Sequence, residues 1–143
     1  MTKPPTDKLL PDIIHPLMQP KTLVLNLSGT LIDHTFVFGK GVTIKKRPGL
    51  KKFIKKAAMQ FEVVVFSDDD SIFIESILPL LDPEQRMIAG YFGKECMVMS
   101  GMRSFKDLKY LNRDLKNVII IESDPKKVKN KENMILLSDF HGQ

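Results

Sequence analysis

The stretch Lys21-Thr-Leu-Val-Leu-Asn26-Leu-Ser28-Gly-Thr30-Leu-Ile32 decides the fold of this chain. Its apolar run at 23–25 ends in small polar residues around Gly29, and apolar residues return directly afterwards. This pattern is typical of a buried β-strand followed by a tight loop. Open α/β sheets bind ligands beyond the carboxyl ends of such strands. We therefore take residues 26–30 as the candidate site, against the plainer alternative of an ordinary Asn/Ser/Gly turn.

Length and composition indicate one globular domain. The chain has 143 residues, 43% of them hydrophobic, and a mean hydropathy of -0.10. No apolar run approaches the roughly 18 residues that a membrane-spanning helix needs. The single cysteine, Cys96, excludes an intramolecular disulfide and leaves the redox compartment open.

The net charge of +5 is unevenly distributed. Residues 1–60 hold 11 Lys/Arg and 3 Asp, whereas residues 61–143 hold 11 Lys/Arg and 14 acidic residues. A basic front half can mark an anionic partner such as lipid, nucleic acid or an acidic peptide, or simply a solvated lysine face. We favour the solvated face. Among the anionic partners, nucleic acid is the one that we favour least.

The chain divides into two parts. Residues 1–20 contain five prolines, too many for a helix, and lack the apolar core of a signal peptide. We expect an extended, proline-rich arm that lies on a domain formed by residues 21–143. Its expected anchors are Leu9, Leu10, Ile13 and Ile14.

The domain alternates strands and helices, which indicates an α/β fold with a mostly parallel sheet. We expect helices from Leu50 and over 71–81, the second with Pro79 near its end, where that proline would close it early. The expected sheet strands are 23–25, 62–66, 87–92, 118–121 and 134–137. Hairpins are expected at 35–45 and 97–105, each around a glycine turn. The first hairpin should stand directly over the loop at Asn26.

The expected first helix is amphipathic. Apolar residues recur at spacings of three and four, which places them on one face. The opposite face carries the basic side chains Lys51, Lys52, Lys55 and Lys56. This lysine face is the candidate surface for anionic lipid.

Four segments together resemble the CTD-phosphatase (FCP-homology) branch of the haloacid-dehalogenase (HAD) superfamily, over residues 21–143. They are 22–30, 46–49, 66–67, and 106–115 with 118–125. The resemblance implies a HAD-like Rossmannoid fold, with flanking helices and β-hairpin insertions around a central, mostly parallel sheet.

The family's catalytic loop has the pattern Asp-x-Asp-x-Thr. The resemblance places its nucleophile at Asn26, its general acid/base at Ser28 and its third loop residue at Thr30. A neutral amide lacks the anionic oxygen that attacks phosphorus, and a serine hydroxyl is a poor proton shuttle near neutral pH. We therefore expect a pseudophosphatase and no enzyme activity.

Three further family positions fall outside this loop. The phosphate-binding hydroxyl falls on Ser67, the lysine that offsets phosphoryl charge on Lys106, and the metal carboxylate on Glu122. Ser67 and Lys106 are consistent with either a residual phosphate site or a purely structural role. Two carboxylates of the Mg²⁺ site are lost, so we expect no functional metal and no cofactor.

Within this branch, the chain is similar to the receptor-subunit family of the mitochondrial presequence translocase. Leu9-Leu-Pro-Asp12, Leu111-Asn-Arg-Asp114 and Glu132-Asn133 carry that similarity. It implies a protein-binding domain on the intermembrane-space side of the mitochondrial inner membrane, with the channel subunit and presequence peptides as partners.

The expected binding residues are Phe36 and Phe38 on the first hairpin and the acidic cluster Asp68, Asp69 and Asp70. The acidic cluster could attract a basic presequence or simply cap the next helix. The basic front half argues against simple presequence reception. The alternatives are a structural subunit of a larger mitochondrial complex, docked through its lysine helix and arm, and, with least support, an active phosphatase.

Overall fold

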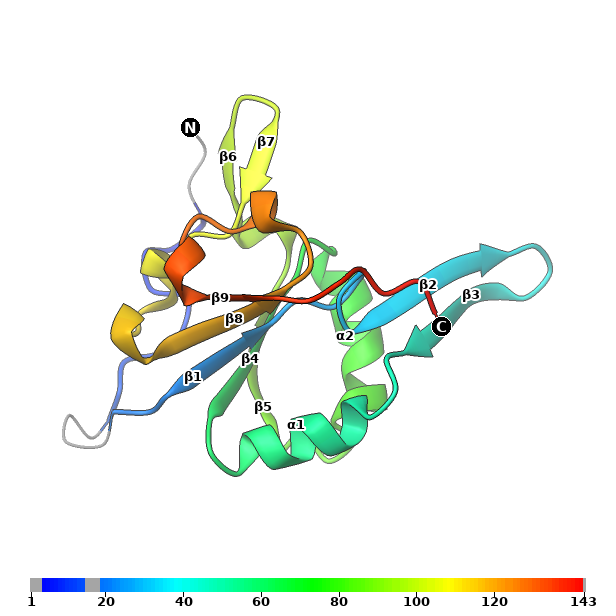
Figure 1. Cartoon of the computed structure of the whole chain (residues 1–143), viewed down its shortest axis with the longest axis horizontal. Helices are drawn as coiled ribbons and strands as arrows, with labels where there is room; N and C mark the ends of the chain where they lie inside the picture. Colours follow the sequence, from blue (N-terminus) through cyan, green and yellow to red (C-terminus); the bar gives the residue numbers. More distant parts are fainter. Residues whose placement is uncertain (1–3, 15–18, 143) are drawn as a thin grey trace.

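The apolar runs of the sequence form the strands of a central sheet. In a computed structural model that describes residues 4–14 and 19–142, five strands pair in parallel in the order β5-β4-β1-β8-β9 (Figure 1). They are β1 (Thr22–Leu25), β4 (Glu62–Phe66), β5 (Ile88–Phe92), β8 (Val118–Glu122) and β9 (Met134–Leu136). The parallel α/β architecture expected from the sequence is confirmed.

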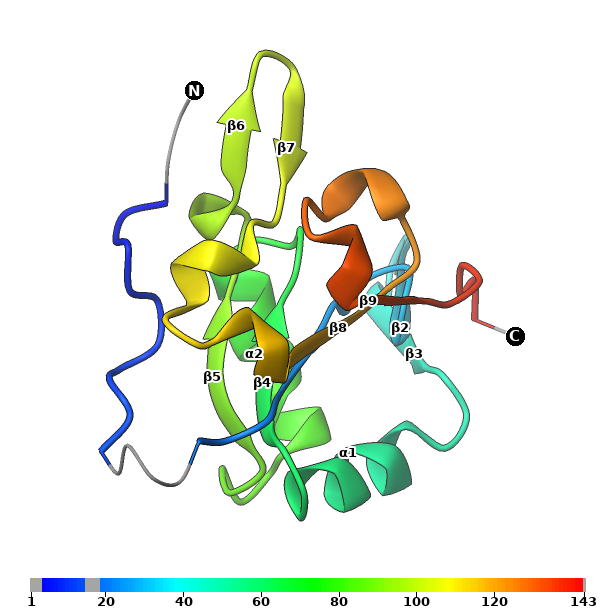
Figure 2. The same ribbon diagram turned by 60° about the vertical axis from the view of Figure 1, so that its left-hand side comes forward.

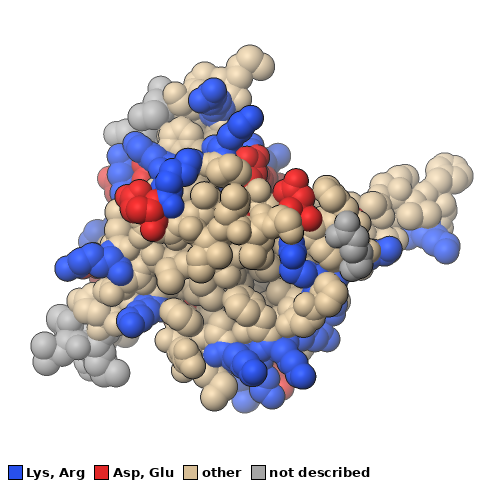
Figure 3. All heavy atoms as spheres, viewed as in Figure 1, with Lys and Arg blue, Asp and Glu red and all other residues tan. Residues whose placement is uncertain are grey.

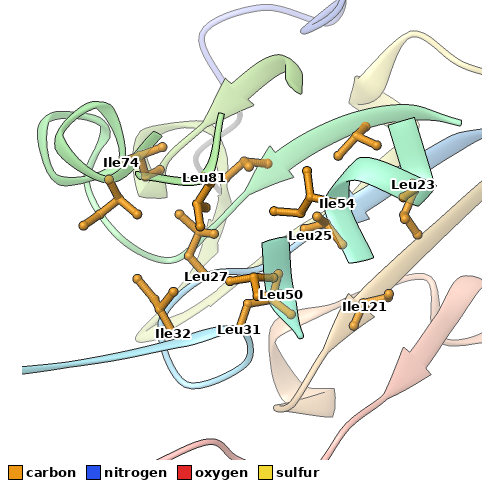
Figure 4. Packing of buried hydrophobic residues seen from close by; sticks show 14 residues of the cluster. Leu23, Leu25, Leu27, Leu31, Ile32, Leu50, Ile54, Ile74, Leu81 and Ile121 are labelled. Atoms are coloured by element: carbon orange, nitrogen blue, oxygen red, sulfur yellow. The ribbon is translucent and has the colours of Figure 1, made fainter. Parts of the chain in front are cut away.

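Alternate residues of the strands supply two cores, because successive side chains of a strand point to opposite faces. On one face, Leu23 and Leu25 of β1 pack in a cluster with Ile54 of α1 (Leu50–Ala58) and Ile74 of α2 (Ser71–Leu81), shown in Figure 4. On the other face, Val24 packs in a second cluster with arm and loop residues. Both faces of β1 are therefore covered, which explains its unbroken apolar run.

The two helices begin and end where their local sequence requires. Asp70 caps α2 by accepting a hydrogen bond from the Phe73 backbone N–H at 2.8 Å. Pro79 lies inside α2 without ending it, so the expected early closure is wrong. A proline in the last turn removes one intrahelical hydrogen bond, while Leu81 beyond it is anchored in the core.

Two antiparallel hairpins extend from the body, as expected. The first consists of β2 (Ile32–Val37) and β3 (Gly41–Lys46), and the second of β6 (Val98–Ser100) and β7 (Arg103–Phe105). Figure 1 shows the β2–β3 tip directed away from the central sheet. The base of the hairpin contacts the loop at 26–30, since His34 Nδ1 lies 3.2 Å from Ser28 Oγ, so the expected position over this loop holds for the base and not for the tip.

The remaining connections contain short 3₁₀ helices. The segment 106–115 consists of tight turns of this kind. They are η1 (Lys94–Cys96), η2 (Leu108–Leu111), η3 (Leu115–Asn117), η4 (Pro125–Lys127) and η5 (Lys131–Asn133). Among the described residues, no helix is both long and apolar enough to cross a bilayer.

The described part of the arm, residues 4–14, runs beside the turns of η2 (Figure 2). The backbone N–H of Leu9 donates to Tyr110 O at 2.9 Å, and that of Leu10 to Leu111 O at 3.3 Å. Leu10 is buried in the second core, whereas Ile14 is 87% exposed. Leu10 is thus an anchor, and the expected anchoring by Ile14 is wrong.

Candidate functional site

The parallel strands bring the expected site residues together. Asn26 follows β1, Ser67 follows β4 and Glu122 ends β8, and these three strands are neighbours in the sheet. Lys106 enters from the segment after β7. All four side chains are between 0% and 2% exposed, and so is Thr30. The site is therefore part of the interior of the protein.

The Lys106 ammonium lies at the centre of this site. Its Nζ is 2.9 Å from Asn26 Oδ1, 3.1 Å from Glu122 Oε2 and 2.8 Å from Asp68 Oδ1. Two of the three N–H donors of the ammonium go to Asn26 and Glu122, whereas the contact with Asp68 Oδ1 is an ion pair without a hydrogen bond. Lys106 is therefore surrounded by three oxygens, and two of its protons are donated within the chain.

Both the nitrogen and the oxygen of the Asn26 side-chain amide form hydrogen bonds. Its Nδ2 donates to Thr30 Oγ1 at 2.8 Å and to the Ser28 carbonyl at 3.1 Å. Its Oδ1 accepts from Lys106 and lies 3.1 Å from Ser67 Oγ. The two donors of an amide suit this position, since a carboxylate oxygen in place of Nδ2 would face the Ser28 carbonyl oxygen.

Asp69 connects the loop after β1 to the loop after β4 through hydrogen bonds. The Ser28 hydroxyl donates to Asp69 Oδ1 at 2.6 Å, and the Ser28 backbone N–H donates to Oδ2 at 3.2 Å. Ser67 Oγ also donates to Asp69, and accepts from the Leu27 N–H at 3.3 Å. The Ser28 hydroxyl proton is thus held by a carboxylate at the site of the family's acid/base.

The opposite side of the loop is tied to the end of β8. Thr30 Oγ1 and Ser123 Oγ are 2.8 Å apart, and Ser123 Oγ donates to the Gly29 carbonyl at 3.1 Å. Gly29 has a φ of 82°, a left-handed conformation that glycine adopts without strain. The loop is therefore held from both sides.

The pKa of Glu122 is raised. Burial is the main cause, since it disfavours the charged carboxylate, and the nearby Asp68 acts in the same direction. The Lys106 ammonium lowers the pKa but does not offset the burial. The carboxylate form of Glu122 is therefore less favoured than that of an exposed glutamate.

The residues of the site do not fit a magnesium ion. Mg²⁺ requires near-octahedral oxygen coordination and is held mainly by carboxylates. Here a positive ammonium already lies among the three oxygens, and one of these is a neutral amide oxygen. A cation in the same place would meet the Lys106 charge at close range.

The three acidic residues expected at a cleft mouth each have an intramolecular partner. Asp68 pairs with Lys106, Asp69 accepts from Ser28 and Ser67, and Asp70 caps α2. Sequence reasoning missed the role of Asp68 as an ammonium partner. This role could have been inferred from the position of Asp68 directly after Ser67, at the end of a strand next to β1.

The expected aromatic binding residues lie apart from the buried site. Phe36 is 74% exposed and Phe38 is 95% exposed, both at the distal end of the β2–β3 hairpin. The base of the hairpin does contact the loop, because His34 Nδ1 is 3.2 Å from Ser28 Oγ. The His34 ring also contacts the Phe73 ring of α2 in a tilted arrangement, with ring centroids 4.7 Å apart.

The lysine face of α1 is open to solvent. Lys51, Lys52, Lys55 and Lys56 are all exposed, on the side opposite the buried Leu50, Ile54 and Ala57. Figure 3 shows blue basic atoms gathered at the lower edge, where Figure 1 places α1. The amphipathic pattern expected from the sequence is thus present.

Fold and site together define a HAD-like α/β domain with neutral residues at the two leading catalytic positions. The chain belongs to the NLI interacting factor-like phosphatase family, whose sequence profile matches residues 21–143. This confirms the resemblance stated from the sequence motifs.

Curated relatives are subunits of a mitochondrial translocase. The chain is 34% identical over 141 residues to "Mitochondrial import inner membrane translocase subunit tim50" of Neurospora crassa, which covers 98% of this chain and 26% of the relative. It is 33% identical over 146 residues to subunit TIM50 of Caenorhabditis elegans, covering 99% and 32%. The chain therefore spans about a quarter to a third of the length of these relatives.

Solved structures share the fold. The structure of Fcp1, described as an essential RNA polymerase II CTD phosphatase, has a TM-score of 0.74 and 17% identity, and the match covers 85% of this chain and 42% of that one. A putative β-phosphoglucomutase from Thermotoga maritima has a TM-score of 0.58 and 11% identity, with 82% and 84% covered. At these identities, the likeness concerns the fold alone.

Proposed function

We propose that this chain is a non-enzymatic pseudophosphatase domain that binds protein partners in mitochondrial inner-membrane protein import. The translocase subunits that are 33–34% identical over nearly the whole chain support the process and the mitochondrial location. The proposed partners are the channel subunit and presequence peptides, on the intermembrane-space side of the membrane.

The observation that carries the non-enzymatic role is the position of Asn26. Its side chain is 2% exposed and hydrogen-bonded at both ends, and its amide oxygen contacts an ammonium. A phosphoryl-enzyme intermediate needs an anionic oxygen at this position that a substrate can reach. Asn26 provides neither the charge nor the access.

A phosphatase assay with Mg²⁺ tests this role. We expect no turnover of a chromogenic phosphate ester above a heat-treated control. Asn26→Asp should also be inactive, because Ser28 cannot protonate the leaving group and the new carboxylate loses the hydrogen bond to the Ser28 carbonyl. Turnover by the natural chain, or rescue by this single change, would overturn the proposal.

The proposed protein contact lies on the β2–β3 hairpin. Phe36 and Phe38 expose aromatic rings, which bury much apolar area in protein interfaces. The acidic cluster at 68–70 has partners within the chain, so the hairpin has more free contact surface.

Co-isolation of the translocase from mitochondria tests the hairpin. Phe36→Ser combined with Phe38→Ser should lose the channel subunit, whereas Ile72→Ser, at a position 79% exposed on α2, should retain it. Calorimetric titration with a presequence peptide at low salt tests the other partner. If the double variant keeps the channel subunit and no peptide binds at micromolar concentration, the receptor role is wrong.

The second candidate is a structural subunit of a larger mitochondrial complex. The exposed lysine face of α1 favours it, because Lys51, Lys52, Lys55 and Lys56 could contact anionic lipid or acidic protein. Purification from native membranes separates the two candidates, since a structural subunit co-migrates with its complex in stoichiometric amount.

A further inference from the structure

A second polar region lies beside the buried site, between the β6–β7 hairpin and the segment that contains η4 and η5. It is a cavity of about 480 Å³ whose polar lining consists of Arg103, Ser104, Asp124, Lys126, Lys127 and Lys131. None of the six family positions lines it. The cavity is therefore distinct from the degenerate catalytic site.

The lining carries four cationic groups against one carboxylate. Asp124 Oδ1 accepts a hydrogen bond from the Lys126 backbone N–H at 3.0 Å, so this carboxylate is directed at the backbone of η4. In the described part of the chain, the side chains of Arg103 and Lys126 have no ion pair or hydrogen bond. Both are exposed and available to an anion.

The other two cations are held in place. Lys131 Nζ donates to the carbonyls of Pro125 and Val128, which fixes its ammonium at the cavity wall. Lys127 Nζ is 3.4 Å from Ser104 Oγ, which connects the wall to β7. Positioned cations lose less conformational entropy when they bind than free surface lysines do.

The backbone around the cavity is braced against the interior. The Lys106 N–H donates to the Lys127 carbonyl at 2.7 Å, and the Lys129 N–H donates to the Lys106 carbonyl at 2.9 Å. The cavity wall is thus attached to the residue that supplies the buried ammonium. A ligand here would meet a preformed surface.

We propose that this cavity binds a phosphate group. A tetrahedral phosphate offers several acceptor oxygens and up to two negative charges, which match a guanidinium, several ammonium groups and the Ser104 hydroxyl. The phosphate can belong to a soluble phosphorylated molecule or to a lipid headgroup, since the recognised chemistry is the same. This assignment is independent of the import role.

Calorimetric titration with sodium pyrophosphate at low salt tests the soluble source. Sedimentation with phosphatidylcholine vesicles, with and without phosphatidylglycerol, tests the headgroup. The test variant is Arg103→Gln combined with Lys126→Gln. The matched control, Arg86→Gln combined with Lys116→Gln, removes the same charge from exposed positions outside the cavity and outside the lysine face of α1.

We expect the natural chain to bind pyrophosphate or the anionic vesicles, and the cavity variant to bind that probe at least about tenfold more weakly, because two charge-assisted hydrogen bonds are lost. The control at Arg86 and Lys116 should keep its affinity within about threefold. Failure of the natural chain to bind either probe would overturn the proposal. Equal weakening in both variants would also overturn it, since attraction would then come from net charge alone.

Discussion

The buried site and the β2–β3 hairpin follow each other in the sequence but differ in their exposure. Asn26 and Thr30 are 2% and 0% exposed, whereas Phe36 and Phe38, a few residues later, are 74% and 95% exposed. The loop at 26–30, where the family resemblance places the nucleophile, is buried, and the chain then extends apolar side chains into solvent.

This difference supports the proposed division between a structural interior and a binding hairpin. Most of the buried polar groups hydrogen-bond to one another, so they contribute to the fold. The hairpin contributes little to the core and exposes the side chains that an interface uses. We therefore expect changes in the buried site to affect stability, and changes at the hairpin tip to affect binding.

Lys106→Met should give the largest loss of stability. It removes the ammonium and leaves the buried Glu122 carboxylate and Asn26 oxygen without their donor. Breaking a buried ion pair on one side typically costs about 3–5 kcal/mol. The free energy of unfolding from urea titrations at neutral pH measures the effect.

Lys127→Met is the matched control for that measurement. Its side chain is 33% exposed and its Nζ is 3.9 Å from Asp68 Oδ2, so its loss should cost less than about 1 kcal/mol. Equal losses in the two variants would contradict the view that the buried site depends on one fully enclosed cation.

Asp82→Asn should give the next largest loss. Asp82 is 4% exposed, and its carboxylate accepts backbone N–H bonds from Arg86, Met87 and Ile88 at 2.9–3.0 Å. An amide replaces one accepting oxygen with a donor that faces these N–H groups, which should cost about 2 kcal/mol.

The difference in stability between the natural chain and Asp82→Asn should also depend on pH. Burial raises the pKa of Asp82, but the backbone hydrogen bonds outweigh burial and lower the pKa overall. Its contribution to stability is therefore present above the unfolded pKa of about 4 and is lost as pH falls through the lower folded value. Unfolding titrations at decreasing pH should show the gap between natural chain and variant narrowing, and a constant gap would refute the assignment.

Glu122→Gln should show a pH dependence of opposite sign. Because the folded protein raises the Glu122 pKa, it holds that proton at pH values where the unfolded chain has released it. The free energy of unfolding then falls as pH rises above about 4.5, with a slope of at most about 1.4 kcal/mol per pH unit. Glu122→Gln should remove this slope, whereas the exposed control Glu132→Gln should keep it.

Much of the fold could be predicted from the sequence because local signals agreed with the tertiary structure. The apolar runs gave the five strands, and α2 occupies the expected 71–81. The direction of the β2–β3 hairpin could not be predicted, since a glycine turn defines pairing within a hairpin but not its angle to the body. The exposure of Ile14 likewise depends on where the arm leaves the domain.

The positions of the site residues could be predicted from the sequence, but the contacts that their side chains make could not. Parallel strand order brings Asn26, Ser67 and Glu122 together, as the motifs implied. The sequence left open whether Lys106 faces a phosphate or the interior. That depends on the three oxygens around its Nζ, and one of them belongs to Asp68, whose pairing with Lys106 is a tertiary contact.

Phe36→Ser combined with Phe38→Ser should have the smallest effect on stability. Both residues are mostly exposed, so their removal opens no core and should change the free energy of unfolding by less than about 0.5 kcal/mol. Urea titration measures this beside Leu25→Ala, whose fully buried side chain should cost about 2–5 kcal/mol. A loss above about 2 kcal/mol in the double variant would mean that the hairpin tip packs against the domain, and the separation of a structural interior from a binding tip would then fail.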